Sequence, residues 1–192
     1  MVGQKVVTFF HIGVVHPYVK RMVESVRKHL NAPIVQMTDL ETEMLDVDDC
    51  IRQDSKGIAK ARIDHLMSFP HEEMLHLDTD VVIRKDVFHV FDQEFDVALT
   101  WRPDMRSRYN SGVMFSRSIT FWEECSEWFS DQGEKTAGWG GDQRSMNAIA
   151  ASGRFDVLEL PCSTYNWSPE PGITMGDDVA IVHYKGARKN WH

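Results

Sequence analysis

The sequence has few cysteines, no long apolar run and no signal-peptide pattern. Its 3 cysteines, Cys50, Cys125 and Cys162, lie too far apart for a C-x-x-C metal motif or a disulfide framework. This cysteine usage is typical of the reducing cytoplasm. No window reaches the roughly 18 apolar residues of a membrane span, and the first residues lack the apolar core of a secretory signal. We therefore expect a cytoplasmic protein without a transmembrane segment.

The chain also lacks a net positive charge. Its formal net charge is −8, which argues against a protein that grips nucleic acid mainly by neutralising phosphates. Basic residues nevertheless gather in two short stretches, for which a locally basic cleft and a solvated face are both open interpretations. The first stretch holds Arg102, Arg106 and Arg108, and the second holds Lys185, Arg188 and Lys189.

One domain spanning residues 1–192 is the natural interpretation, because 192 residues suffice for a single hydrophobic core. The chain starts with a β-branched and aromatic strand at 6–10, an amphipathic helix at 17–30 and a second strand at 32–37. This β-α-β order predicts an α/β fold with a mostly parallel central sheet flanked by helices. The first strand carries no Gly-rich fingerprint, which excludes classical dinucleotide binding.

The rest of the chain continues this alternation. The acidic stretch at 39–55 has no regular pattern, so we expect a solvated loop there. A helix at 57–69 ends at Pro70, and a helix at 119–131 carries aromatic residues for the core. We expect a further helix from the glycine-rich stretch at 138–141 to about Ser152, and strands of the same sheet at 74–77, 95–100, 109–115, 155–160 and 179–183.

The most informative stretch is the apolar strand at 74–77, which ends in Asp78 and Asp80. In open α/β sheets, ligands bind at the carboxyl ends of strands, and residues two apart on an extended chain point the same way. Both carboxylates can therefore converge on a hard cation such as Mg²⁺ or Mn²⁺, which in turn binds phosphate oxygens. D-x-D alone is weak, because Asp46 and Asp48 repeat it in an acidic run, which we interpret as solvated surface.

Three further motifs stand at the ends of predicted elements, and their order along the chain adds to the signal of each. One residue has two open interpretations, because Asp142 suits both a ligand contact and the N-cap of its helix. The motifs are Asn110, Ser111 and Gly112 at the start of a strand, Gly140, Gly141, Asp142 and Gln143 at the start of a helix, and His183, Gly186 and Lys189, spaced H-x-x-G-x-x-K, from the end of the last strand.

With the carboxylate pair, this ordered set resembles the GT-A-fold, nucleotide-sugar-dependent glycosyltransferases. It is most similar to the retaining family 8, which includes glycogenin and bacterial galactosyltransferases, over about residues 6–191. The resemblance implies a single GT-A (Rossmann-like) domain. It also implies transfer of a hexose from a UDP-sugar to an acceptor, with retention of the anomeric configuration.

The resemblance further implies a metal centre. Asp78, Asp80 and His183 match the protein ligands of a Mn²⁺ or Mg²⁺ ion, and the histidine must be unprotonated at its metal-binding nitrogen. The physical chemistry agrees, because a nucleoside diphosphate leaves only when its developing charge is neutralised. A divalent ion and a lysine, here Lys189, neutralise that charge.

The donor site follows from the same resemblance. Arg62, Asn110 and Asp142 match the residues around the donor sugar and its anomeric carbon, and they are the expected catalytic residues. Phe9 and Phe10 match the base-binding position at the first strand only loosely. The residues assigned to the nucleotide sugar are Phe9, Phe10, Thr79, Ser111, Gly112, Gln143, Gly186 and Lys189.

Two departures from the family leave the acceptor open. The first is the ending Lys189, Asn190 and Trp191, in which asparagine replaces the usual proline, so the effect of this ending on donor binding is open. The second is that the chain has no basic or aromatic tail for membrane attachment. A sugar chain, a lipid-linked sugar, a protein and a modified nucleobase all remain candidate acceptors.

Three other functions compete with glycosyl transfer. A sugar-nucleotide pyrophosphorylase would need a basic, Gly-rich loop after the first strand, but residues 9–16 contain no lysine or arginine. A phosphatase with a D-x-D nucleophile would carry that motif after its first strand and place Gly-Thr behind it, whereas Val81 follows Asp80. A catalytically silent nucleotide-sugar-binding protein is the alternative that only a turnover assay decides.

Overall fold

The structure, a computed structural model, describes residues 4–54, 58–69, 72–103, 107–132 and 140–191. Gly57 and Pro70, at the ends of the predicted second helix, lie outside the described residues, as do Arg106, Gly138 and Trp139. Within the described ranges, no helix combines the length and the apolar character that crossing a membrane requires.

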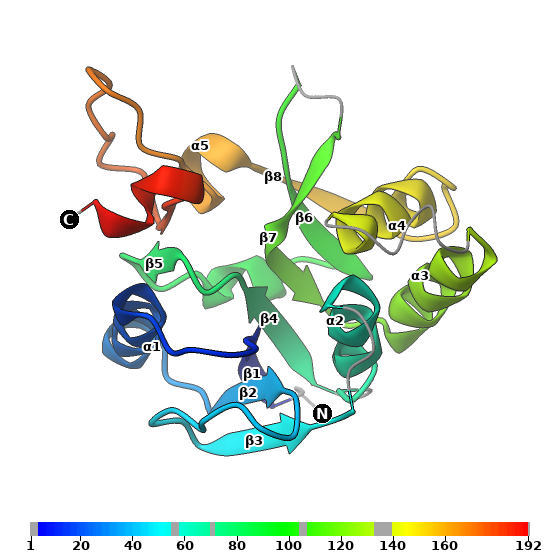
Figure 1. The fold of residues 1–192 in the computed structure, drawn as a ribbon. Coiled ribbons are helices and arrows are strands. Elements are labelled where there is room, and N and C mark those ends of the chain that lie inside the picture. Colours follow the sequence, from blue (N-terminus) through cyan, green and yellow to red (C-terminus); the bar gives the residue numbers. More distant parts are fainter. Residues whose placement is uncertain (1–3, 55–57, 70–71, 104–106, 133–139, 192) are drawn as a thin grey trace.

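A sheet of seven strands forms the centre of the molecule, in the order β3-β2-β1-β4-β7-β6-β8 (Figure 1). Strand β7 runs antiparallel to both of its neighbours, and the other neighbouring pairs are parallel. The predicted α/β fold with a mostly parallel sheet is therefore confirmed. The strands are β1 Lys5–Phe10, β2 Ile34–Thr38, β3 Asp49–Arg52, β4 Glu73–Leu77, β6 Val97–Trp101, β7 Tyr109–Ser116 and β8 Val157–Pro161.

Helices cover both faces of this sheet (Figure 1). Helix α1 packs on one face, and α2, α3 and α4 pack on the other. Helix α1 begins with Pro17 and buries Val19, Met22, Val23 and Val26, because these residues recur at helical spacing. The helices are α1 Pro17–His29, α2 Ile58–Leu66, α3 Ile119–Asp131, α4 Gly141–Ala150 and α5 Cys162–Tyr165, with the 3₁₀ helices η1 Phe88–Asp92 and η3 Gly186–Asn190.

Alternating side chains of the central strands supply two hydrophobic clusters. On β1, Val7 and Phe9 belong to the cluster under α1, whereas Val6 and the half-buried Phe10 belong to the cluster under α2, α3 and α4. Because both faces of the sheet are covered, β2 and β4 are buried along their whole length. This double burial explains why the central strands are mostly apolar on both faces rather than alternating between apolar and polar residues.

The prediction of a loop at 39–55 is wrong in part, because β3 forms there as an edge strand parallel to β2. The side chains of β3 are exposed or half-buried. They therefore show no apolar pattern, and main-chain hydrogen bonds to β2 hold the strand in place. Asp46 and Asp48 are exposed, as predicted for a solvated pair, and Asp48 lies 2.6 Å from Arg27.

The last strand does not join the central sheet, which corrects a second prediction. Strand β9 Ile181–His183 pairs antiparallel with β5 Val81–Ile83 in a separate two-stranded sheet. An apolar run predicts a strand but says nothing about its partner, which lies far away in sequence. Val81 and Ile83 are buried, so the chain stays in the core after the carboxylates.

The direction of β7 decides where the motifs meet. Because β7 runs antiparallel to β4, its first residues lie at the edge of the sheet where β1 and β4 end. The pairing of β6 with β7 shifts in register between Leu99 and Thr100, opposite the residues that follow Asn110. Such an irregularity lets a segment leave the ladder and turn its side chains toward a site.

Candidate active site

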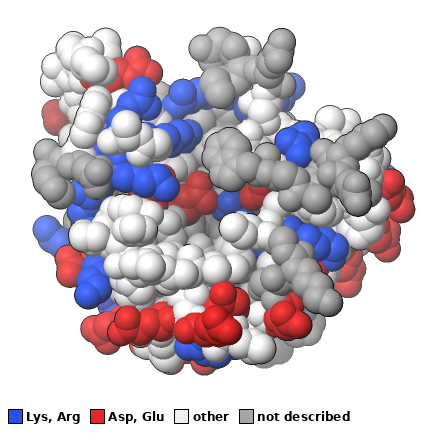
Figure 2. Space-filling view, viewed as in Figure 1, with Lys and Arg blue, Asp and Glu red and all other residues white. Residues whose placement is uncertain are grey.

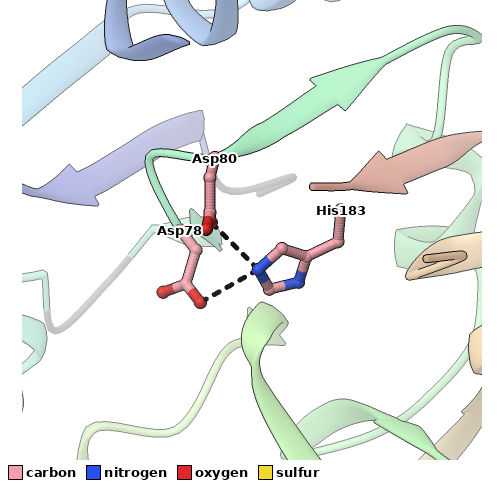
Figure 3. Close-up of side chains that lie close together, drawn as sticks. All are labelled: Asp78, Asp80 and His183. Atoms are coloured by element: carbon pink, nitrogen blue, oxygen red, sulfur yellow. Dashed lines mark ion pairs between the residues drawn. The ribbon is translucent and has the colours of Figure 1, made fainter. Parts of the chain in front are cut away.

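Two carboxylates and one imidazole converge at the carboxyl edge of the sheet. Asp78 and Asp80 follow β4, and His183 is the last residue of β9. The Nε2 atom of His183 lies 2.9 Å from Asp80 Oδ1 and 3.5 Å from Asp78 Oδ2, so the three side chains point at one position (Figure 3). The fold thus brings together the three residues that the motif pattern assigned to a metal.

Backbone pairing between β5 and β9 holds the histidine in this position. Val81, directly after Asp80, is the register partner of His183. The N–H of Tyr184 donates to the Asp80 carbonyl at 2.9 Å. Main-chain hydrogen bonds therefore fix the imidazole against the carboxylates, although they lie far apart in sequence.

The chemistry of this group suits a divalent cation. One ligand atom from each of Asp78, Asp80 and His183 lies within 4.8 Å of the others. Two carboxylates favour a hard cation such as Mn²⁺ or Mg²⁺, and the imidazole adds a nitrogen ligand. Burial would raise the pKa of Asp80, but the hydrogen bond and charge of His183, together with Lys189, lower it, so this ligand is anionic.

Arg62 links the metal carboxylates to the predicted sugar-binding residues. From helix α2 its guanidinium donates to Asp78 Oδ1 and Asp142 Oδ2, both at 2.9 Å, and to the Ser111 carbonyl at 2.5 Å. Burial would lower the pKa of Arg62, but the charges of Asp78 and Asp142 raise it. With 11% of its side chain exposed, Arg62 forms a largely dry charge cluster with both carboxylates.

Asp142 does not cap helix α4, which removes one of its two interpretations. The N-cap is Gly140, whose φ of 79° is left-handed, and the helix begins at Gly141. The Asp142 carboxylate turns to Arg62. Its place in the first turn still sets a negative charge near the positive end of the helix dipole.

His76 and Thr8 orient Arg62, and neither was identified from the sequence. Arg62 Nε donates to His76 Nε2 at 3.0 Å, and His76 Nδ1 lies 2.9 Å from Thr8 Oγ1. Burial, and then the charge of Arg62, hold the pKa of His76 well below its ordinary value. The ring is therefore neutral and accepts from Arg62. In the sequence, the polar residue His76 within the mostly apolar strand β4 was the one sign that could have pointed to this contact.

The first residues of β7 form hydrogen bonds with helix α4 and with the backbone at Asp78. Gln143 Oε1 accepts from Asn110 Nδ2 at 3.1 Å and from the N–H of Ser111 at 3.3 Å. The Gly112 carbonyl accepts from the N–H of Asp78 at 2.8 Å. The residues that the motifs assigned to the sugar and to the metal therefore belong to one hydrogen-bonded unit.

Gly112 leaves room for the imidazole of His183. A Cβ atom on Gly112 would lie 2.3 Å from Cε1 and 2.6 Å from Nδ1 of that ring. The ring cannot swing aside without losing its contacts, because its Nε2 faces Asp80 and its Nδ1 lies 2.8 Å from Asn166 Oδ1. Close approach, rather than backbone conformation, therefore requires glycine here.

Lys189 reaches the carboxylates from helix η3. Its Nζ lies 3.2 Å from Asp80 Oδ2 and 5.0 Å from the centroid of the Tyr18 ring. Burial would lower the pKa of Lys189, but Asp80 raises it. Gly186 starts this helix with a φ of 60°, a conformation that favours glycine. Arg21 of α1 donates to the Lys189 carbonyl at 3.2 Å and so ties η3 to α1.

Parts of the two basic stretches meet beside this group. Burial, and then the charge of Arg102, lower the pKa of Lys185, and Arg102 donates to the Ser168 hydroxyl at 3.3 Å. Neither cation has an ion-pair partner within the described part of the chain, whereas Arg108 lies 2.5 Å from Glu159. Figure 2 shows lysine and arginine atoms gathered above red acidic atoms near the middle of this face.

The two predicted base-binding phenylalanines face opposite sides of the sheet. Phe9 is fully buried in the cluster under α1 and has no surface to offer a base. Phe10 is half-buried and packs against His65, with ring centroids 5.3 Å apart and ring planes tilted by 51°. Thr79, between the two metal carboxylates, is also half-buried. Contacts of Phe10 and Thr79 with a nucleotide remain predictions.

A surface groove elsewhere is separate from this group of side chains. It lies between α1 and the 43–46 segment and is lined in part by Val23, Met44 and Leu45. None of the predicted site residues lines it. The carboxylate edge is the stronger candidate site, because charged and hydrogen-bonding groups converge there.

The seven-stranded sheet with helices on both faces is the fold of a glycosyltransferase. The crystal structure of the glycosyltransferase GlyE from Streptococcus pneumoniae TIGR4 matches this chain with a TM-score of 0.72 over 98% of its residues, at 16% sequence identity. This chain spans 57% of the GlyE chain. At this low sequence identity, the match shows that the two proteins share a fold and nothing more. No protein-family model matches the sequence, and no curated protein matches it significantly.

The close approach at Gly112 leads to a test of the metal site. In Gly112→Ala the added methyl group must displace the His183 ring, so we expect Mn²⁺ affinity to fall by about 10-fold or more, the range seen when metal ligands lose their support. Electron paramagnetic resonance of free Mn²⁺ measures this affinity. Gly153→Ala is the control, because Gly153 has a φ of 72° and no atom near its Cβ position. It should lose stability and keep its Mn²⁺ affinity, and equal affinities in the two variants would contradict the expectation.

Proposed function

We propose that this chain is a metal-dependent glycosyltransferase that moves a hexose from a nucleoside diphosphate sugar to an acceptor, with retention of the anomeric configuration. The observation that carries the proposal is the convergence of Asp78, Asp80 and His183 at the carboxyl edge of a glycosyltransferase fold. Lys189 stands beside them. Such a group suits a diphosphate, because it offers a hard cation and an ammonium to phosphate oxygens.

The chain's own residues provide the charge that a leaving diphosphate needs. Asp78, Asp80 and His183 would hold Mn²⁺ or Mg²⁺, which supplies Lewis acidity toward phosphate oxygens when bound. Lys189 is held by Asp80 at the same place and brings a second positive charge to the diphosphate. Lys185, which lies next to the site without a carboxylate partner in the described ranges, adds a third.

The polar groups beside the metal residues suit a sugar ring. Asn110 Oδ1 accepts from Gly112 N–H and from Asn166, and its amide donates one hydrogen bond to Gln143. One amide hydrogen of Asn110 is left for a sugar hydroxyl among the described contacts. Among the described contacts, Asp142 accepts from Arg62 through Oδ2, which leaves Oδ1 to accept from a second hydroxyl.

The carboxylates that are present support the proposed retention. A double displacement needs a carboxylate nucleophile at the anomeric carbon, but the candidate, Asp142, is held by Arg62. We therefore propose front-face transfer. The bond from the anomeric carbon to the diphosphate breaks with its electron pair on the diphosphate oxygen, and the acceptor oxygen bonds to the same face. The acceptor proton passes to the leaving oxygen, which Lys189 and its neighbours stabilise.

The nucleotide and the hexose rest on the family resemblance, which favours UDP. The acceptor stays open among a sugar chain, a lipid-linked sugar, a protein and a modified nucleobase. A catalytically silent nucleotide-sugar-binding protein is the alternative function. Turnover of a panel of nucleotide sugars with Mn²⁺, against binding of the same panel, separates the two.

Metal dependence is the first expected outcome. Removing divalent ions with EDTA should abolish sugar transfer or donor hydrolysis, because the leaving diphosphate then loses its main charge stabilisation. Mn²⁺ or Mg²⁺ added after dialysis should restore the rate, whereas dialysis without EDTA should leave it unchanged. Full turnover of the chelated protein would sink the assignment of Asp78, Asp80 and His183.

Removing the charge of Asp142 is the second test. In Asp142→Asn the amide oxygen can still accept from Arg62, so we expect the free energy of unfolding to change by only about 1 kcal/mol. We expect kcat to fall by about 100-fold, the order that losing one preorganised electrostatic contact costs. Asp46→Asn is the matched control, because Asp46 is exposed in the other D-x-D pair. A variant with normal kcat would reduce Asp142 to a structural partner of Arg62.

Stereochemistry is the third test. With an α-linked donor, the first-formed product should carry an α linkage, because the acceptor attacks from the face that the diphosphate leaves. Proton NMR of the anomeric signal, recorded before any equilibration of released sugar, reads this outcome directly. A β-linked first product would place the chain with inverting enzymes instead.

A further inference from the structure

Asn166 is a fully buried residue beside the metal-binding histidine, outside every motif discussed above. It is the C-cap residue of helix α5. The residue after it, Trp167, hydrogen-bonds to β9: its N–H donates to the Ile181 carbonyl at 3.0 Å, and the N–H of His183 donates to its carbonyl at 2.7 Å. The backbone of Asn166 is therefore held against the strand that carries His183.

Three short hydrogen bonds surround the side chain of Asn166. Its Oδ1 lies 2.8 Å from His183 Nδ1. Its Nδ2 donates to Thr100 Oγ1 at 2.7 Å and to Asn110 Oδ1 at 2.8 Å. The carboxamide has no room for another conformation without losing bonds that a fully buried polar group needs.

The directions of these bonds follow from a backbone group that can only donate. The N–H of Gly112 donates to Asn110 Oδ1 at 3.1 Å, so this atom of Asn110 must be an oxygen. Asn166 must then turn its NH₂ group to Asn110 and its oxygen to His183. An amide oxygen only accepts, so Nδ1 of His183 must carry a proton.

A second backbone donor fixes the same directions independently. The N–H of Ser111 donates to Gln143 Oε1 at 3.3 Å, which identifies that atom as an oxygen. Asn110 therefore meets Gln143 with its NH₂ group, as the 3.1 Å bond between them requires, and presents its oxygen on the other side to Asn166. Both backbone donors, the N–H groups of Gly112 and Ser111, therefore lead to the same conclusion: Nδ1 of His183 carries a proton.

We infer that Asn166 is a positioning residue that keeps a proton on Nδ1 of His183 and thereby leaves Nε2, the nitrogen that faces Asp78 and Asp80, as the ligand for a cation. The hydrogen bond made by one imidazole nitrogen decides the role of the other, and outer partners of this kind support metal ligands. The inference rests on the metal site of the proposed function, but it does not depend on sugar transfer.

The relay also joins two parts of the site that act on different portions of a donor. Asn110 and Gln143 belong to the group assigned to the sugar, whereas His183 belongs to the metal group. Because Asn166 contacts both Asn110 and His183, the position of the sugar-binding amides and the orientation of the imidazole depend on the same buried bonds.

The proton itself can be observed in the unaltered protein. We would label histidine with ¹⁵N, identify His183 by comparison with His183→Gln, and record imidazole ¹⁵N–¹H correlations in metal-free and Mg²⁺-saturated samples. His183 should show a slowly exchanging N–H at Nδ1 in both samples, because the ring is 3% exposed. Absence of a proton from Nδ1 in either sample would overturn the inference without any Asn166 variant.

Variants at Asn166 separate positioning from simple stability. Asn166→Leu removes the acceptor for Nδ1–H, so we expect loss of that N–H signal and about 10- to 100-fold weaker Mn²⁺ binding by electron paramagnetic resonance. Asn166→Asp keeps an acceptor, although it loses the bond donated to Asn110. It should therefore retain the Nδ1 proton and bind Mn²⁺ more tightly than Asn166→Leu, even where it melts at a lower temperature.

Thr100→Val is the matched control, because it removes one hydrogen bond of the same asparagine and leaves the contact with His183 intact. It should lower thermal stability and keep both the Nδ1 proton and the Mn²⁺ affinity. A folded Asn166→Leu protein with an unchanged signal and unchanged affinity would refute the inference. Failure of the unaltered protein to bind Mn²⁺ would instead contradict the proposed metal site, while the proton on Nδ1 is read without metal.

Discussion

The convergence of three carboxylates at one edge of the sheet is the constraint that the surrounding side chains satisfy. Asp78, Asp80 and Asp142 carry like charges, which repel one another by several kcal/mol at short range near a protein surface. Arg62 lies between Asp78 and Asp142. Asp80 is contacted by Lys189 and by the imidazole of His183. Each carboxylate therefore has a cationic or hydrogen-bonding partner. The cluster is stable while keeping the charge that a cation and a phosphorylated ligand require.

Neutral hydrogen-bonded groups hold these charges in place. His76 orients Arg62 by accepting a hydrogen bond from its Nε atom. Asn166 orients the imidazole of His183, and its own orientation is set by a chain of hydrogen bonds that begins at the Gly112 N–H. Buried polar groups of this kind tolerate few alternative arrangements, because an unmade hydrogen bond in a dry site is costly. A site built in this way is arranged before its ligand arrives, which is the condition under which fixed dipoles and charges stabilise a transition state most effectively.

Local pattern predicted the parts of the fold that depend on burial of neighbouring side chains. The first strand, helix α1 and the strand before Asp78 have strong periodicity or continuous apolar runs, and the structure contains all three. Edge strand β3 was missed because its side chains are only exposed or half-buried and its hydrogen bonds to β2 leave no trace in composition. Strand β9 was recognised as a strand but assigned to the wrong sheet, since its partner β5 is remote in sequence.

The sequence by itself determined which residues have the chemistry for a metal and a diphosphate, because Asp, His and Lys stand at the ends of predicted elements, in an order that resembles a known family. Only the tertiary structure decided which of them meet. It turned Asp142 from a possible helix cap into a partner of Arg62, enclosed Phe9 in the core, and set Asn166 behind His183. The physical reason is that hydrogen-bond direction and charge pairing act between atoms a few ångströms apart, whatever their separation along the chain. Only strand pairing and the packing of helices on the sheet bring those atoms together.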